Sequence, residues 1–250
     1  MSNQSMFSVA WTLLVWSLLA GGGAAFAAFA GWVSAAPARA GRIPVEPPAG
    51  AVPLASAPPQ TVELTLPFDG IWGVVQGMDS GDTHVGYAAY ALDFVPAEKL
   101  AGALPEAGRR RLEDFPCYGR PVLAPAAGRV IWARDGARDR PPHHKGKHDP
   151  GNFLIIEHAA AEYTELRHLR QRSLRVKVGD QVLRGQPVAT CGNSGNAGTP
   201  HLHVGLLGSA DPIATRPMRF SRYQVLQRDG SWSAGDGAPV TGQLLRRTPR

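Results

Sequence analysis

The segment AGTPHLHVGL, residues 197–206, places two histidines one residue apart, directly after a glycine-rich run. Residues two apart on a β-strand project from the same face, so His201 and His203 are expected side by side. The intervening Leu202 and the following Val204 then face the core. Two imidazoles on one face suit a metal site, although a strand with two solvated histidines has the same pattern. The segment therefore predicts a half-buried strand that is entered through a tight loop.

Short strands of this kind recur along the chain. The 29 glycines and 22 prolines favour many short elements over long helices, and the hydrophobic fraction of 44% is enough for a core. We expect a mostly β fold, an antiparallel sandwich or barrel, with one helix inserted at Glu98–Asp114, where leucines recur at helical intervals. Strands are expected within residues 62–68, 70–77, 90–95, 120–134 (two strands around a turn at Gly128), 151–159, 162–169, 174–190 and 201–207.

The N-terminus reads as an export segment. Met6–Val33 is apolar and carries no charge, and Ala38-Arg39-Ala40 is a small-residue cleavage pattern. A signal peptide cut after Ala40 is favoured, but the length also suits an uncleaved membrane anchor. Either way, the remainder is expected in the periplasm or cell envelope. We expect the chain to divide into the export segment (1–40), a Pro/Ala-rich linker (41–61), a folded domain (62–222) and a C-terminal extension (223–250).

The overall charge of the chain bears on the kind of partner that it could bind. The net charge of +6 and the pI of about 9.7 suit an anionic partner such as nucleic acid, a membrane surface or an acidic wall polymer, but charge alone does not choose among them, and a solvated basic surface gives the same values. The basic residues are scattered rather than interleaved with aromatic residues, so we expect no nucleic-acid partner, and we expect a monomer.

Cys117 and Cys191 lie in no CxxC pair, which excludes zinc held by cysteines. One disulfide and two free thiols both remain open.

A hydrolytic zinc needs three protein ligands and one open position. Asp93 lies in the apolar run YALDF, where a buried carboxylate needs a metal or a cation; a salt bridge to an arginine is the alternative. His84, in GDTHVGY, is a second candidate ligand or an ordinary loop histidine. His168, in ELRHLR, is the remaining histidine beside apolar strand residues. The other histidines, at positions 143, 144, 148 and 158, receive no role.

GNSGNAGTPHLHV, together with LRHL and VKVGDQVLRGQPVAT, resembles the lysostaphin-type (LytM-like) zinc metalloendopeptidases, which cut peptide cross-links in bacterial peptidoglycan. The resemblance covers about Leu64–Leu207. It implies a peptidoglycan substrate, a metallopeptidase domain with duplicated-hybrid-motif character, and an exported enzyme that uses Zn²⁺. Mapped by motif, the resemblance assigns zinc ligation to His84, Asp93 and His203. It assigns general-base catalysis and stabilisation of the intermediate to His168 and His201, without deciding which residue has which role.

Three features depart from the common family pattern. Eight residues separate His84 from Asp93, as in the subset with a long spacer; Leu166 replaces the usual tyrosine before the catalytic histidine; and the Glu98–Arg120 insert has no counterpart in compact members. Members of the fold that lack a ligand act as wall-binding or hydrolase-activating modules. Every ligand position is filled here, so the sequence favours the enzyme over that alternative.

Overall fold

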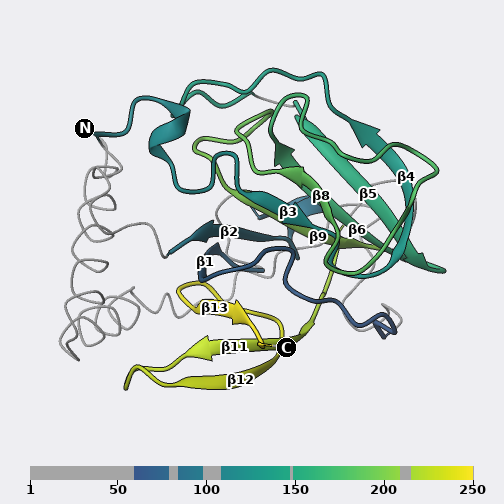
Figure 1. Cartoon of the computed structure of the whole chain (residues 1–250), viewed down its shortest axis with the longest axis vertical. Helices are drawn as coiled ribbons and strands as arrows, with labels where there is room; N and C mark the ends of the chain where they lie inside the picture. The colour runs from purple at the N-terminus through teal and green to yellow at the C-terminus, as the bar shows by residue number, and fades with distance from the viewer. Residues whose placement is uncertain (1–58, 79–83, 98–107, 147–148, 209–214, 250) are drawn as a thin grey trace.

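The computed structural model describes residues 59–78, 84–97, 108–146, 149–208 and 215–249 (Figure 1). The predicted export segment and nearly all of the predicted linker lie outside these ranges. Within the described ranges, no helix is long and apolar enough to span a membrane.

Most of the strands in the described ranges belong to one large antiparallel sheet. Its strand order is β12-β11-β13-β1-β2-β9-β6-β5-β4-β7, and β10 also pairs with β9. A second sheet contains β3 (Pro121–Leu123) and β8 (Pro187–Thr190). The mostly antiparallel β prediction is therefore confirmed. The strands of the large sheet are β1 (Trp72–Gln76), β2 (Leu92–Pro96), β4 (Gly128–Arg134), β5 (Asn152–Ala159), β6 (Glu162–Leu169), β7 (Gln181–Val182), β9 (Leu202–Leu207), β10 (Thr215–Arg216), β11 (Phe220–Leu226), β12 (Trp232–Gly237) and β13 (Leu244–Arg247).

The core lies against one face of the central strands. Leu202 and Val204 of β9 are fully buried, as the alternation in HLHVGL predicts. Their paired neighbours on β2 and β6 are fully buried as well, including Phe94 and Leu166. The central residues between them, including His203, face the opposite side of the sheet, so the same alternation that builds the core also presents polar side chains on the other face.

The C-terminal strands continue the large sheet. β13 pairs with β1 through Trp72 and Leu245, and β11 lies between β12 and β13. In Figure 1 these yellow strands extend the sheet beyond β1. The predicted boundary between residues 222 and 223 falls within β11. Upstream, Leu64 forms an isolated bridge with Phe220, which brings the start of the described chain against the same strand.

A disulfide joins Cys117 to Cys191, with the Cα atoms 5.8 Å apart. Both cysteines are almost completely buried. Backbone hydrogen bonds between Gly119 and Cys191 and between Cys191 and Arg120, both 2.8 Å, reinforce the connection. The structure thus decides between the two alternatives that the sequence left open, and it fixes the segment around residue 117 to the end of β8.

Two local predictions are wrong. Residues 62–68 form no strand, although their side chains alternate, because Leu64, Thr65 and Leu66 are all buried and the backbone bonds to several separate segments. The two strands predicted around a turn at Gly128 are found as β3 and β4, but Gly128 begins β4 and does not form the turn. The two strands also form no hairpin, since β3 pairs with β8 whereas β4 pairs with β5 and β7.

The predicted inserted helix is also not found as such. Residues 98–107 lie outside the described ranges. The described part contains the short 3₁₀ turn η3 (Leu112–Asp114), in which Asp114 accepts hydrogen bonds from the backbone of Arg110 and Arg111. Pro116, two residues after this turn, disfavours a helical continuation.

Candidate metal centre

The centre is built where β2 and β9 pair directly. Asp93 and His203 are opposite each other in the register, which places their side chains on the same face of the sheet. The Oδ1 atom of Asp93 lies 2.9 Å from Nδ1 of His203, and both residues are buried. Among the described residues, Asp93 forms its ion pairs with histidines and not with an arginine. The structure therefore does not support the alternative of a salt bridge to arginine.

His84 reaches the same carboxylate from the segment before the 3₁₀ turn η1 (Gly86–Ala88). Its Nδ1 lies 3.0 Å from the carbonyl oxygen of Gly77, and because a carbonyl only accepts, Nδ1 is the donor. The other nitrogen, Nε2, lies 3.2 Å from Oδ1 of Asp93. Only 2% of the His84 surface is exposed, so the ring is fixed at the site rather than solvated as a loop histidine.

The electrostatics reflect a carboxylate enclosed by imidazoles. Burial alone would raise the pKa of Asp93, but the surrounding histidines hold this pKa well below its usual value. Burial alone would lower the pKa of His203, yet Asp93 and Glu165, which face its two ring nitrogens, raise it to about 9. The histidines therefore favour the ionised form of Asp93, which is the form that binds a metal.

The donor set fits zinc. One ligand atom from each of His84, Asp93 and His203 can be chosen so that all three lie within 4.8 Å of one another. Two imidazole nitrogens and one carboxylate oxygen form the three-ligand set of a hydrolytic zinc, which keeps a fourth position open. The hydrogen bond from His84 to Gly77 also matches the usual pattern, in which a ligating histidine donates its other N–H to a carbonyl or carboxylate.

His168 reaches the centre because β6 contains a bulge. The register with β5 shifts between the Asn152–Leu169 pair and the Phe153–Arg167 pair, which leaves His168 as the extra residue. Its φ of 59° lies in the left-handed region, which is uncommon for residues other than glycine and is concentrated at functional sites. The bulge places the ring 5.6 Å from the ring of His203, centroid to centroid.

His168 is held in a defined tautomer. Its Nδ1 lies 2.9 Å from the carbonyl oxygen of Ser194, so Nδ1 carries the proton and Nε2 of the neutral ring is unprotonated. Burial, followed by the neighbouring His201 and His203, keeps the pKa of His168 well below its usual value. The ring is therefore neutral at neutral pH and able to accept a proton at Nε2.

His201 lies just before β9, beside His168. The two ring centroids are 4.7 Å apart. Nδ1 of His201 lies 2.7 Å from the carbonyl oxygen of Thr199, and Nε2 lies 3.5 Å from Oδ2 of Asp93. Its side chain is 15% exposed, compared with 6% for His203. The five residues that the sequence singled out thus meet at one place, and His201 lies on its more open side.

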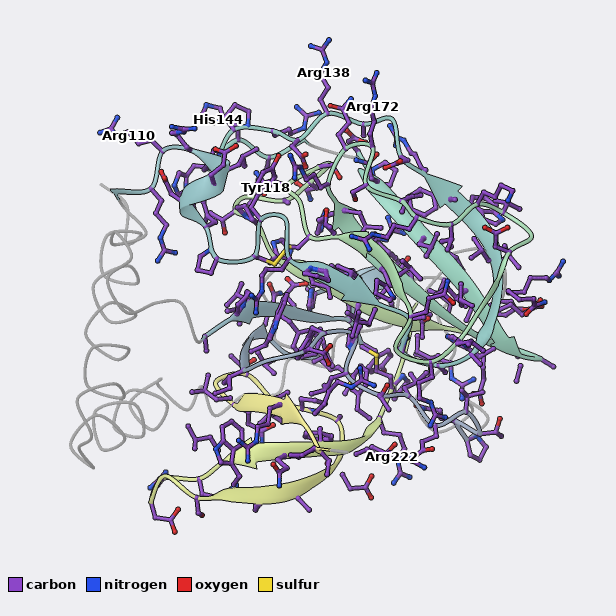
Figure 2. The ribbon with its side chains drawn as sticks, in the orientation of Figure 1. Arg110, Tyr118, Arg138, His144, Arg172 and Arg222 are labelled. Atoms are coloured by element: carbon purple, nitrogen blue, oxygen red, sulfur yellow. A yellow bond between two sulfur atoms is a disulfide. The ribbon has the colours of Figure 1, made fainter. Side chains whose placement is uncertain are left out.

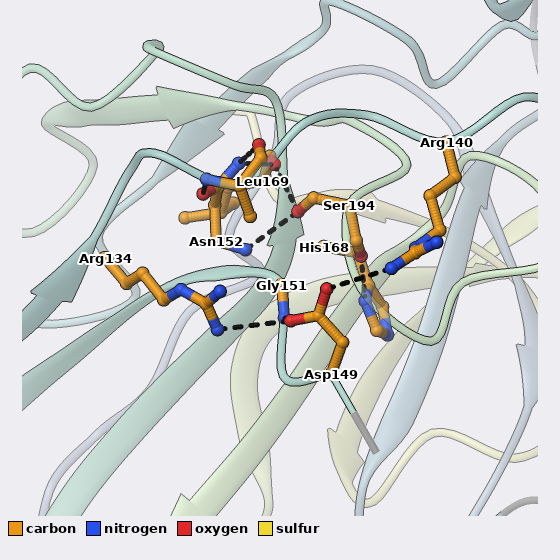
Figure 3. A network of polar contacts seen from close by, with 9 residues as sticks. Arg134, Arg140, Asp149, Gly151, Asn152, His168, Leu169 and Ser194 are labelled. Carbon is orange, nitrogen blue, oxygen red and sulfur yellow. Dashed lines mark hydrogen bonds and ion pairs between the residues drawn. The ribbon is translucent and has the colours of Figure 1, made fainter. Parts of the chain in front are cut away.

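A hydrogen-bonded framework supports the carbonyl that holds His168 (Figure 3). The Ser194 hydroxyl donates to the carbonyl of Leu169 and accepts from the backbone N–H of Asn152, both at 2.8 Å. The Asn152 amide donates to the same Leu169 carbonyl at 3.0 Å.

Next to this network, Asp149 forms ion pairs with Arg134 and Arg140, and its carboxylate accepts a hydrogen bond from the backbone N–H of Gly151. These contacts fix the loop after β8 against the end of β6.

The sequence analysis did not predict the supporting residues. Glu165, Arg167, Asn152 and Ser194 are buried polar residues beside the centre, and none was selected. For Glu165 a signal existed, because a carboxylate within a strand-like run is the feature that marked Asp93. For the others, only the fold brings them to the site.

Three of the four histidines that received no role lie within the described ranges, and none of the three belongs to the candidate ligand set. His143 donates its backbone N–H to the carbonyl of Gly198. His144 is exposed, and Figure 2 shows it at the outer edge of the molecule in the region of Arg110 and Arg138, with Arg222 toward the opposite end. His158 bonds to the backbone of Ala127 and to Thr164. His148 falls outside the described residues.

Leu166, which stands where the family pattern has a tyrosine, lies on the core face of β6. It is fully buried and faces Val204 in the core, so no side chain at this position reaches the polar face. On the polar face, Arg167 of the same strand lies beside His203 instead, with its guanidinium 5.3 Å from the ring centroid of Tyr87.

Part of the chain matches a known protein family. Residues 113–215 match peptidase family M23. The matched segment contains three of the five site residues, His168, His201 and His203. His84 and Asp93 precede it. The M23 match confirms the resemblance that the motifs indicated at the level of the family, whereas the long-spacer grouping stays a prediction.

Parts of the chain are also similar to proteins of known sequence and to solved structures. Over 109 residues, the chain is 34% identical to the peptidoglycan DD-endopeptidase ShyC of Vibrio cholerae serotype O1, an alignment that covers 43% of this chain and 24% of ShyC. Among solved structures, a zinc-containing peptidase from Vibrio cholerae is 25% identical, with a TM-score of 0.39 and coverage of 58% of this chain and 37% of the other. The catalytic domain of lysostaphin from Staphylococcus simulans is 21% identical, with a TM-score of 0.35 and coverage of 58% and 84%. The chain thus spans about a quarter of the length of ShyC.

Proposed function

We propose that this protein is an exported zinc metalloendopeptidase that hydrolyses peptide bonds in peptidoglycan cross-links. The observation that carries the proposal is the convergence of His84, Asp93 and His203 on one buried point, with the rings of His168 and His201 beside it. The M23 match and the peptidoglycan DD-endopeptidase relatives support a peptidase that acts on the wall.

His84, Asp93 and His203 would hold the zinc ion. When bound there, zinc would act as a Lewis acid and would make a water molecule nucleophilic near neutral pH. Asp93 supplies one negative charge, and its position between imidazoles keeps it ionised. The Gly77 carbonyl fixes the tautomer of His84, so Nε2 is the nitrogen available for the metal.

His168 and His201 would handle the proton and the substrate. His168 is held neutral by burial, and its unprotonated Nε2 is suited to take the proton of the attacking water and return it to the leaving amine. His201 lies on the more open side and is suited to stabilise the negative charge that develops on the substrate carbonyl oxygen. This division of roles goes beyond the sequence, which left the two histidines equivalent.

Export is supported by two independent features. The uncharged stretch Met6–Val33, followed by Ala38-Arg39-Ala40, predicts transport across the membrane with cleavage or with retention as an anchor. The buried disulfide Cys117–Cys191 suits an oxidising compartment such as the periplasm. Fractionation of cells that express the full chain, with immunoblotting of each fraction, tests this part of the proposal; a cytosolic full-length product would contradict it.

The activity is tested on purified sacculi. Wild-type protein with zinc should convert cross-linked dimeric muropeptides to monomers in chromatography with mass spectrometry, whereas a glycosidase would release cut glycan strands. Asp93→Ala should reduce this conversion to background, and His144→Ala, a change at an exposed histidine outside the ligand set, should leave it unchanged. Zinc-loaded wild type that sediments with sacculi without cutting them would contradict the enzyme and favour the wall-binding alternative.

A further inference from the structure

The ring of His203 lies between two carboxylates, and only one of them belongs to the ligand set. On one side, Nδ1 lies 2.9 Å from Oδ1 of Asp93. On the other side, Nε2 lies 3.6 Å from Oε1 of Glu165. Glu165 is completely buried in β6, so its position beside the ring is imposed by the fold and not by chance contact at the surface.

Arg167 directs one particular oxygen of Glu165 toward the ring. Its Nε and Nη2 atoms both lie 2.8 Å from Oε2. The other oxygen, Oε1, is therefore the one that faces His203. The guanidinium carbon also lies near two aromatic rings, 5.3 Å from the centroid of Tyr87 and 5.6 Å from that of Phe153. Arg167 both neutralises the buried carboxylate and fixes its orientation.

A glycine makes room for this arrangement. Gly205 is opposite Glu165 in the β6–β9 register, two residues after His203 on the same face. A Cβ atom at Gly205 would lie 2.7 Å from Cγ2 of Thr215 and 3.0 Å from both Cγ and Oε1 of Glu165. A side chain at position 205 would therefore crowd Thr215 and Glu165, and glycine lets the glutamate pack closely against the strand that carries His203.

The two facing atoms are otherwise unsatisfied. Among the described residues, neither Oε1 of Glu165 nor Nε2 of His203 has a hydrogen-bond partner, and both atoms are buried. Leaving a buried donor or acceptor without a partner is costly. The separation of 3.6 Å is slightly longer than a hydrogen bond, so a small approach of the two side chains is enough for Nε2–H to donate to Oε1. This arrangement satisfies both atoms and leaves Nδ1 of His203 as the nitrogen that faces Asp93.

We propose that Glu165 is a positioning residue for zinc: it accepts the Nε2–H of His203 and thereby fixes the ring with Nδ1 turned toward the metal. The inference rests on the proposed zinc function and deepens it. A carboxylate behind a ligating histidine sets the tautomer and increases the basicity of the ligand, and loss of such a partner weakens metal affinity about 10–100-fold. Glu165 touches neither substrate nor the reacting atoms, so it acts through His203.

The test measures zinc affinity by competition with a chromophoric chelator on the full chain. Glu165→Met removes the acceptor at similar volume and should weaken zinc binding about 10–100-fold, whereas Glu165→Gln retains an amide oxygen and should weaken it less. Because Glu165→Met leaves Arg167 as an unpaired buried charge, the double variant Glu165→Met/Arg167→Met removes the pair together and keeps the test valid if the single variant does not fold.

Glu162 provides the matched control. It is a buried glutamate of the same strand, but its carboxylate accepts from the backbone N–H groups of Thr61 and Val62, away from the centre. Glu162→Gln should lower the melting temperature without changing zinc affinity. A loss of zinc affinity in Glu162→Gln as large as that in Glu165→Met would mean that general destabilisation explains both, and it would overturn the assignment.

Imidazole ¹⁵N spectra give a readout that a purely structural role would not change. In zinc-loaded wild type, the Nε2 resonance of His203 should have the shift of a protonated, hydrogen-bonded nitrogen, and it should move in Glu165→Met while the His84 resonances stay in place. Wild type that binds no zinc would overturn the proposed function itself. Wild type that binds zinc, with all Glu165 variants binding equally well and an unmoved Nε2 resonance, would overturn only the role of Glu165.

Discussion

Replacement of both Cys117 and Cys191 by alanine should destabilise the fold by about 4 kcal/mol. The disulfide closes a loop with a sequence separation of 74. The chain-entropy relation gives about −15 cal/mol/K for a loop of this length, or about 4.4 kcal/mol at 298 K. At about 2–4 °C per kcal/mol for a domain of this size, the melting temperature should fall by roughly 9–18 °C.

Thermal unfolding followed by circular dichroism, with and without dithiothreitol, measures this effect. Reductant should bring the melting temperature of the wild type close to that of the double variant and should leave the double variant unchanged. Alanine at two fully buried positions also leaves small cavities, so the dithiothreitol comparison isolates the cross-link itself. An oxidised double variant that melts within about 2 °C of the oxidised wild type would refute the reasoning.

Three further changes have defined outcomes. Gly151→Ala should lower the free energy of unfolding by at least about 1 kcal/mol, because φ is 69° and the new Cβ would lie 2.6 Å from the Ser194 carbonyl oxygen that orients His168. The midpoint of chemical denaturation and the cleavage rate should both fall. Asn152→Ala removes a side chain that bonds three backbone groups and should cost about 1–3 kcal/mol in urea unfolding. Burial lowers the pKa of His158 below 6.5, so the unfolded chain binds more protons than the folded chain and stability falls as the pH drops through 6.5. Between about pH 7.5 and 5.5, the melting temperature of His158→Gln should therefore fall less than that of the wild type.

The sequence predicted the parts of the fold that depend on local pattern. The HLH alternation correctly assigned Leu202 and Val204 to the core, and an apolar run around a single carboxylate correctly marked Asp93 as a buried charge that needs a partner. Alternation failed at residues 62–68, because both sides of that segment are covered and its backbone bonds go to separate elements.

The assembly of the centre depends on contacts that no local pattern contains. Asp93 meets His203 only through the β2–β9 register, across 110 residues. His168 reaches the site through a bulge in the left-handed conformation, which ordinary strand alternation would not predict. The family resemblance supplied the identity of these residues before the structure gave the physical reason for their positions. Glu165 lay outside the family motif and was therefore missed.

The most direct test of the account is the zinc content of the purified full chain, measured by mass spectrometry after reconstitution and dialysis. We predict about one zinc per wild-type chain and per His144→Ala chain, with a marked loss in Asp93→Ala and in His203→Ala. Zinc that stays near one per chain in both ligand variants, or wild type that retains none, would contradict the assignment of this centre.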